Sequence, residues 1–193
     1  MANDITRAID LVWDVARACD VDMSHAIVDV YDLRTDTNAS YSFGDKVSDT
    51  DARNLDVDLK GLQAIVSLDG DYDYYFMSEH ITADVDLGPC MVTPPYGDPD
   101  AALAAVRAIL DRGDMYDSAN IDVHVYNEET GDDVDFRYGE TISEGDVERI
   151  YDLDDIDDID EVVDALQRVV NLEGYTLPGD MSIMADLGRI TVM

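Results

Sequence analysis

The chain has 193 residues, in which 45 Asp and Glu stand against 12 Lys and Arg, a formal net charge of -33. An excess of this size opposes folding through self-repulsion, and it excludes the basic footprint by which proteins bind nucleic acid. No stretch has the roughly 18 apolar residues of a membrane span, nor the basic start and apolar run of a signal peptide. We therefore expect a cytoplasmic protein that contacts neither membrane nor nucleic acid directly.

The apolar content decides between a folded and a disordered acidic chain. Hydrophobic residues make up 46% of the sequence, including 11 Tyr, and they recur at regular spacing, which predicts a folded domain. Cys19 and Cys90 could pair in an oxidising compartment, but because the chain has no export signal we expect two free thiols.

Periodicity and turn residues predict the elements in chain order. The first half predicts a helix over 3–19, strands near 26–33 and 39–43, a short helix capped by Ser48, a helical segment around 62–70 and closing strands through 83–92. The second half predicts a helix over 99–112, strands near 121–127 and 133–138, a short helix capped by Ser143, a helix over 151–170 and closing strands through 181–192. Asp98 is the expected N-cap of the helix that begins at Pro99.

The two halves resemble each other. Residues 26–55 align without a gap on residues 121–150, and the alignment pairs Gly44 with Gly139. Further matches are LQAIVSLDG at 62–70 with LQRVVNLEG at 166–174, and ITADVDLG at 81–88 with SIMADLG at 182–188. The pattern predicts an α+β fold, a tandem duplication of a domain of about 95 residues, each a small, mainly antiparallel sheet packed with helices. We place the domains at 1–93 and 99–193, joined by a Pro/Gly linker at 94–98.

The charge is distributed unequally between the halves. Residues 1–95 hold 6 basic and 19 acidic residues, a charge of -13, whereas residues 96–193 hold 6 basic and 26 acidic residues, a charge of -20. The second half is therefore the more acidic.

The densest acidic stretch is residues 151–170. Apolar residues recur there every three or four positions, at Leu153, Ile156, Ile159, Val163, Leu166 and Val170. This spacing predicts one amphipathic helix, held by packing because neighbouring carboxylates repel each other. Seven acids in ten residues, over about 15 Å of helix, approach the charge spacing of about 1.7 Å along duplex DNA. The simpler interpretation is a solvated helix face.

These carboxylates are the candidate partner-binding residues, together with three acids of a predicted strand in the second half. The set comprises Asp152, Asp154, Asp155, Asp157, Asp158, Asp160, Glu161, Asp132, Asp133 and Asp135.

The sequence offers little support for a metal, a cofactor or catalysis. From Asp69 onward, carboxylates occupy the first, third and fifth positions of an EF-hand loop, but Tyr74 stands where glycine is needed and His80 where glutamate is needed. The three histidines do not recur at matching repeat positions, and no metal-binding, nucleotide-binding or nucleophile motif is present. We therefore predict no enzyme activity, no cofactor and no metal site.

Two functional hypotheses remain. In the first, the chain mimics nucleic acid and blocks the cationic groove of a DNA-handling defence protein, as an anti-restriction or anti-CRISPR inhibitor; the similarity to such inhibitors lies in composition and charge only. In the second, the acidity is a halophilic adaptation of an ordinary soluble protein in a high-salt cytoplasm, where repulsion is screened. An acidic chaperone for basic proteins is a further alternative. The sequence makes no prediction of oligomeric state.

Overall fold

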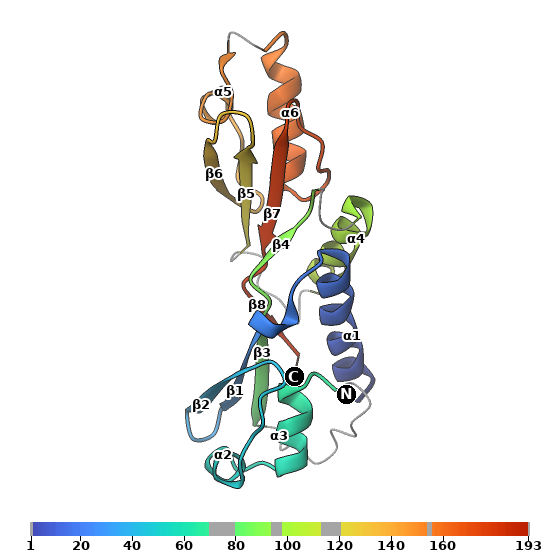
Figure 1. Cartoon of the computed structure of the whole chain (residues 1–193), viewed down its shortest axis with the longest axis vertical. Coiled ribbons are helices and arrows are strands. Elements are labelled where there is room, and N and C mark those ends of the chain that lie inside the picture. The colour runs from blue at the N-terminus through green and yellow to red at the C-terminus, as the bar shows by residue number, and fades with distance from the viewer. Residues whose placement is uncertain (1, 70–79, 94–97, 113–120, 154–155, 193) are drawn as a thin grey trace.

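The structure is a computed structural model that describes residues 2–69, 80–93, 98–112, 121–153 and 156–192. It is an α+β fold, as the sequence predicts, and Figure 1 shows an elongated molecule with two lobes end to end. The helices are α1 (Ala2–Ala18), η1 (Met23–His25), α2 (Asp49–Asn54), α3 (Leu59–Val66), α4 (Pro99–Leu110), α5 (Glu144–Val147) and α6 (Ile159–Val170). The strands are β1 (Ile27–Asp32), β2 (Thr37–Ser42), β3 (Ile81–Asp86), β4 (Pro89–Met91), β5 (Asp122–Asn127), β6 (Asp133–Arg137), β7 (Met181–Asp186) and β8 (Arg189–Thr191).

The strands form two antiparallel sheets that exchange their last strands. The first sheet has the order β2-β1-β3-β8 and the second the order β4-β7-β5-β6. β8, from the end of the chain, therefore completes the sheet of the first half, and β4, from the first half, completes the sheet of the second. We call the first sheet with α1, α2 and α3 the first lobe, and the second sheet with α4, α5 and α6 the second lobe.

The exchange makes one continuous ribbon of the closing strands. Asp86 lies opposite Arg189 in the first sheet, and Pro89 lies opposite Asp186 in the second. Two residues on each strand separate these pairs, so the register continues unbroken from one sheet into the other. The centre of the ribbon is consequently a pseudo-two-fold axis that relates the closing strands of the two sheets.

A glycine on each strand bends the ribbon at this centre. Gly88 and Gly188 have φ of +67° and +57°, the left-handed region that favours glycine. Each glycine donates its amide hydrogen to the aspartate two residues before it, Asp86 or Asp186, at 2.9 Å. The matching Asp-Leu-Gly sequences therefore form matching bends.

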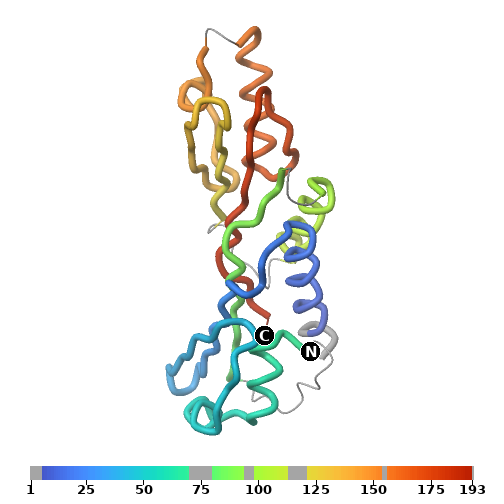
Figure 2. The backbone as a smooth tube through the Cα atoms, in the orientation of Figure 1, coloured from blue at the N-terminus to red at the C-terminus, as the bar shows by residue number. Residues whose placement is uncertain are grey.

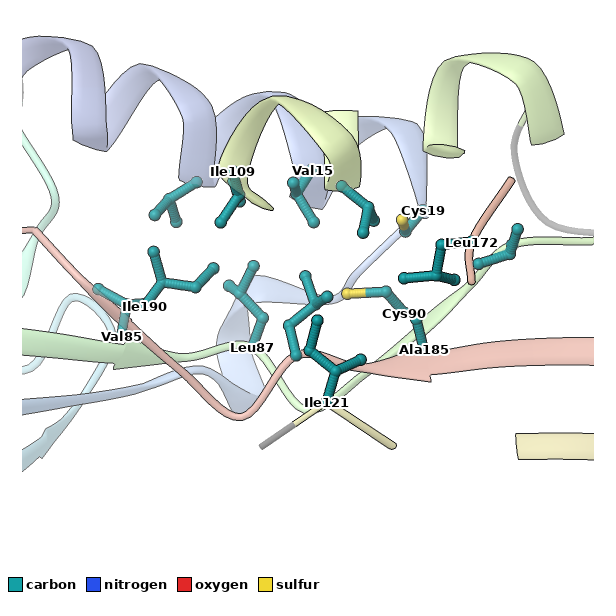
Figure 3. Packing of buried hydrophobic residues seen from close by; sticks show 14 of the residues in the cluster. Val15, Cys19, Val85, Leu87, Cys90, Ile109, Ile121, Leu172, Ala185 and Ile190 are labelled. Carbon is teal, nitrogen blue, oxygen red and sulfur yellow. The ribbon is translucent and has the colours of Figure 1, made fainter. Parts of the chain in front are cut away.

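The core lies on one side of the ribbon, beneath α1 and α4. Figure 3 shows Val85 and Ile190 of the first sheet, and Cys90 and Ala185 of the second, on the side that these two helices cover. All four side chains belong to one buried cluster that extends through both lobes. α1 also packs against α4, so the lobes share an interior.

Both lobes contain the same pair of glutamine hydrogen bonds. Gln167 of α6 accepts a hydrogen bond from the Ile142 amide at 2.9 Å and donates one to the Glu140 carbonyl at 2.8 Å. Gln63 of α3 makes the equivalent two bonds in the first lobe. In each lobe one glutamine thus ties the segment after the hairpin to the sheet-covering helix.

The predicted helix caps are confirmed. Ser48 and Ser143 begin α2 and α5 in capping boxes, and Asp98 caps α4 with Pro99 in the first turn. The domain division at 94–98 stays a prediction, because residues 94–97 lie outside the described residues. Within the part of the chain that the structure describes, no helix is long and apolar enough to cross a membrane.

Candidate protein-binding surface

The side of the ribbon opposite the helices is polar and rich in aspartate. Alternate strand residues point away from the core, and we call this the uncovered side. Its aspartates are Asp29, Asp84 and Asp86 in the first lobe and Asp122, Asp133, Asp135 and Asp186 in the second. Asp29 lies directly opposite Asp84, and Asp122 lies directly opposite Asp186. Like charges facing each other across strands are destabilising, so each pair needs compensation.

The first lobe compensates its pair internally. Asp29 is only 3% exposed, accepts a hydrogen bond from the Ser40 hydroxyl, and pairs with the Arg189 guanidinium at 2.9 Å. Asp84 accepts a hydrogen bond from the Thr191 hydroxyl at 2.7 Å. Arg189 and Thr191 both belong to the exchanged strand β8, so the second half of the sequence supplies the groups that neutralise the first sheet.

Strand exchange consequently increases the charge difference between the lobes. With β8 in place, residues 1–88 and 189–193 hold 7 basic and 19 acidic residues, a charge of -12. Residues 89–188 hold 5 basic and 26 acidic residues, a charge of -21. The acidic excess is therefore concentrated in the second lobe.

The edge of the second sheet carries the predicted strand acids. Asp133 and Asp135 lie on β6, the edge strand, Asp132 lies just before it, and all three are exposed. Asp135 contacts His124 Nδ1 at 2.6 Å, a hydrogen bond between neighbouring strands. The predicted strand acids therefore lie at an exposed edge of the second sheet.

The predicted helix over 151–170 is wrong in its first half. α6 begins only at Ile159, and Asp158 is its N-cap, accepting a hydrogen bond from the Glu161 amide at 3.3 Å. Leu153, assigned to the apolar stripe, is 37% exposed. Aspartate is a poor helix former and a favourable N-cap, so the helix begins after the acidic run instead of including it.

The acids before α6 therefore do not have the charge spacing along a helix that was compared with the charge spacing of duplex DNA. Asp152 and Asp157 lie in irregular chain before α6, and only Asp160 and Glu161 are in its first turn, where negative charge is favourable. Asp154 and Asp155 lie outside the described residues. The helical rise of 1.5 Å therefore applies to few of these acids.

A hollow of about 560 Å³ nevertheless brings several predicted acids together. It lies beside the turn of the β5–β6 hairpin and the start of α6, and its acidic lining residues are Glu129, Asp152, Asp157, Asp158 and Glu161. Four of these five are predicted site residues. Glu129, on the hairpin turn, was not predicted, because nothing in the sequence indicates that the turn lies beside α6.

The rest of the lining is neutral. Tyr151 donates its hydroxyl hydrogen to the Pro178 carbonyl at 3.0 Å, and burial raises the pKa of Tyr151, so the phenol stays protonated. Asn127 is buried and donates to the Ile150 carbonyl at 2.9 Å. Acids around neutral polar and apolar groups suit a lysine or arginine side chain, whose stem is apolar and whose end is cationic.

The described residues contain no group of three or more His, Cys, Asp or Glu side chains arranged to hold a metal ion. The weak EF-hand match falls mostly in residues 70–79, which lie outside the described part of the chain. His80 is 3.6 Å from the buried carboxylate of Asp32, and His25 is 3.7 Å from the exposed Asp22. Each of these two histidines therefore lies near a carboxylate.

Sequence reasoning missed the ion pair between Arg189 and Asp29. The two residues are 160 positions apart and meet only because β8 joins the first sheet. The recurring Asp-Leu-Gly sequence locates the bend, but it does not indicate which sheet the strand after it joins.

The comparisons with known proteins found no match: no protein-family profile, no curated protein and no solved structure is similar to this chain.

Proposed function

We propose that this protein binds the basic surface of a nucleic-acid-binding protein and occupies its cationic groove in place of a duplex, as an inhibitor of a DNA-handling defence protein of the restriction or CRISPR type. The observation that carries the proposal is the charge of -21 in the second lobe, where 26 acidic residues stand against 5 basic ones.

The contrast between the lobes supports this function. The first lobe places Arg189 against its buried Asp29. In the second lobe, Asp122, Asp132 and Asp133 are exposed, and within the described ranges no arginine, lysine or histidine lies at ion-pair distance from them. Repulsion among such carboxylates costs stability in the free protein and is relieved when a cationic groove supplies the counter-charge.

The elongated shape and the net charge are compatible with a groove that holds a duplex. The two lobes lie end to end along one axis (Figure 2). The net charge of -33 equals that of the phosphates in roughly 16 base pairs, about 55 Å of duplex. A target groove long enough for such a duplex could therefore contact both lobes.

Affinity capture with a competitor tests this proposal. The full chain is immobilised, incubated with host extract at low salt, and eluted with a duplex of roughly 16 base pairs. We expect the captured proteins to be DNA-binding proteins that the duplex displaces. Captured basic proteins that the duplex does not displace would instead support an acidic chaperone, and capture of no protein would refute the proposal.

One observation favours the high-salt alternative. Exposed acids also occur on the helices, which cover the other side of the ribbon from the uncovered side. They include Asp10 and Asp14 on α1 and Asp98, the N-cap of α4. The chain also has only two lysines among its 12 basic residues. If habitat alone explains the charge, urea unfolding should show a folded protein at about 3 M KCl and largely unfolded protein at about 0.1 M, where the screening length is about 10 Å. We expect the protein to be folded at both.

A further inference from the structure

The two cysteines of the chain meet in the core. Cys19 directly follows α1, where its amide donates to the Val15 carbonyl at 2.9 Å, and Cys90 is the central residue of β4. They are 2% and 0% exposed. Figure 3 shows both sulfur atoms in the space between α1 and β4, where the two thiols influence each other electrostatically. The Cys90 thiol donates a hydrogen bond to the Gly88 carbonyl at 3.7 Å.

A hollow of about 450 Å³ borders Cys19. Cys19 is part of its lining, together with Leu87, Pro89 and Met91 around the bend of the ribbon. Cys19 therefore lies at the wall of a hollow, only 2% exposed, whereas Cys90 is not part of the lining.

We propose that Cys19 and Cys90 form a reversible disulfide site, oxidised by hydroperoxides, that ties α1 to the exchanged strand β4. β4 belongs to the second sheet, whereas α1 belongs to the first lobe, so the bond holds the two lobes together at the point of strand exchange. This inference does not depend on the proposed function.

The two thiols have different parts in the reaction. The contact with the Cys90 thiol lowers the pKa of Cys19, although burial opposes this effect. The same contact, with burial, raises the pKa of Cys90. Cys19 is therefore the group that attacks, because the thiolate is the nucleophile.

The chemistry balances with hydrogen peroxide as oxidant. The Cys19 thiolate attacks one peroxide oxygen, the O–O bond breaks, and the departing hydroxide takes up a proton to become water. Cys90 then attacks the sulfur of the sulfenic acid, its proton passes to the leaving hydroxide, and a second water departs. Two thiols lose two electrons, and one peroxide is reduced to two waters.

The test uses the full chain and hydrogen peroxide. We expect each wild-type chain to lose both thiols together, with a mass decrease of about 2 Da, to stay monomeric on a non-reducing gel, and to recover both thiols in dithiothreitol. Both thiols still titratable in denaturant after peroxide treatment, or crosslinks only between chains, would overturn the proposal. The wild-type measurement needs no variant and stands even if a cysteine variant does not fold.

Single-residue variants test the roles of the two cysteines in the oxidation. In Cys90→Ser we expect Cys19 to stop at a sulfenic acid that dimedone traps, and in Cys19→Ser we expect Cys90 to react at least about tenfold more slowly than in the wild type. Hydrogen exchange of the oxidised protein should be about tenfold slower in β4 and β7 than in the reduced protein. Equal reaction rates in both variants would overturn the assigned order, and unchanged exchange would overturn the tie between the lobes.

Discussion

Replacing Gln167 with alanine should destabilise the protein by about 2 kcal/mol. The side chain accepts a hydrogen bond from the half-buried Ile142 amide at 2.9 Å and donates one to the exposed Glu140 carbonyl at 2.8 Å. An amide that loses its partner in a half-buried place costs about 1–2 kcal/mol, and the exposed carbonyl, which water can reach, costs about 0.5 kcal/mol. Gln63→Ala removes the equivalent two bonds and should cost the same.

Urea unfolding measures both variants, because the free energy of unfolding falls linearly with urea. For a chain of this size, 2 kcal/mol corresponds to about 4–8 °C in Tm. Asp164→Asn is the matched control, since Asp164 is exposed in the middle of the same helix as Gln167 and should change stability by less than about 0.5 kcal/mol. A cost below 0.5 kcal/mol for Gln167→Ala, or costs for the two glutamines that differ by more than about 1 kcal/mol, would refute the reasoning.

Three further predictions follow from the fold. Ile190→Ala, near the end of the chain, should cost about 2–5 kcal/mol and raise hydrogen exchange first in β1 and β3, because Ile190 is buried in the first sheet; faster exchange mainly in β5 and β7 would contradict the strand exchange. Asp158→Ala should cost about 1 kcal/mol in urea unfolding, whereas Asp158→Asn should cost only a few tenths, and equal costs would show that the residue is not acting as an N-cap. Hydrogen bonds from the capping serines lower the pKa of Asp51 and Asp146 in the folded protein. The stability that these two carboxylates contribute is therefore complete above their unfolded pKa of about 3.9 and is lost as the pH falls through the lower folded pKa. The urea midpoint of the D51N/D146N variant should decline less steeply below pH 4 than that of the wild type, and an identical decline would contradict this.

The elements could be predicted from the sequence where local physics decides them. Alternating apolar residues placed β1, β2, β5 and β6 within a few residues, and serine three residues before aspartate located both short helices. Asp98 followed by proline located the start of α4. These signals act within a few residues, so the rest of the fold does not change them.

The strand exchange could not be predicted, because its two outcomes look the same in the sequence. β4 and β8 are three-residue strands after matching bends, and each would present the same backbone hydrogen-bonding groups to either sheet. Only the packing of the whole molecule distinguishes them. The contacts that depend on the exchange, Arg189 with Asp29 and Cys19 with Cys90, were out of reach for the same reason.

The start of α6 shows the opposite failure. The apolar spacing continues through Leu153 and Ile156, and it predicted a longer helix than the structure has. The low helix propensity of aspartate opposed this pattern, and the helix begins after Asp158, which is its N-cap. The acids in the described part of this segment are exposed, but those before Ile159 do not have the helical spacing assigned to them.

We propose that carboxylates at the hairpin edge of the second lobe, and not net charge alone, bind the partner. Two variants that each remove three charges separate these possibilities: D132N/D133N/D135N in the second lobe, and D10N/D20N/D36N in the first. The control keeps its backbone, because asparagine tolerates the left-handed conformation of Asp20 and Asp36, whose φ are 53° and 55°.

The deciding measurement is the dissociation constant of the captured DNA-binding target for the wild type and both variants across a KCl series. Each lost contact with a cationic groove lowers the slope of log affinity against log salt by about one. We expect the second-lobe variant to bind at least about tenfold more weakly at low salt, with a slope reduced by two to three, and the first-lobe variant to stay within about twofold of the wild type. Equal losses in both variants, or an affinity that does not change with salt in the wild type, would contradict the account.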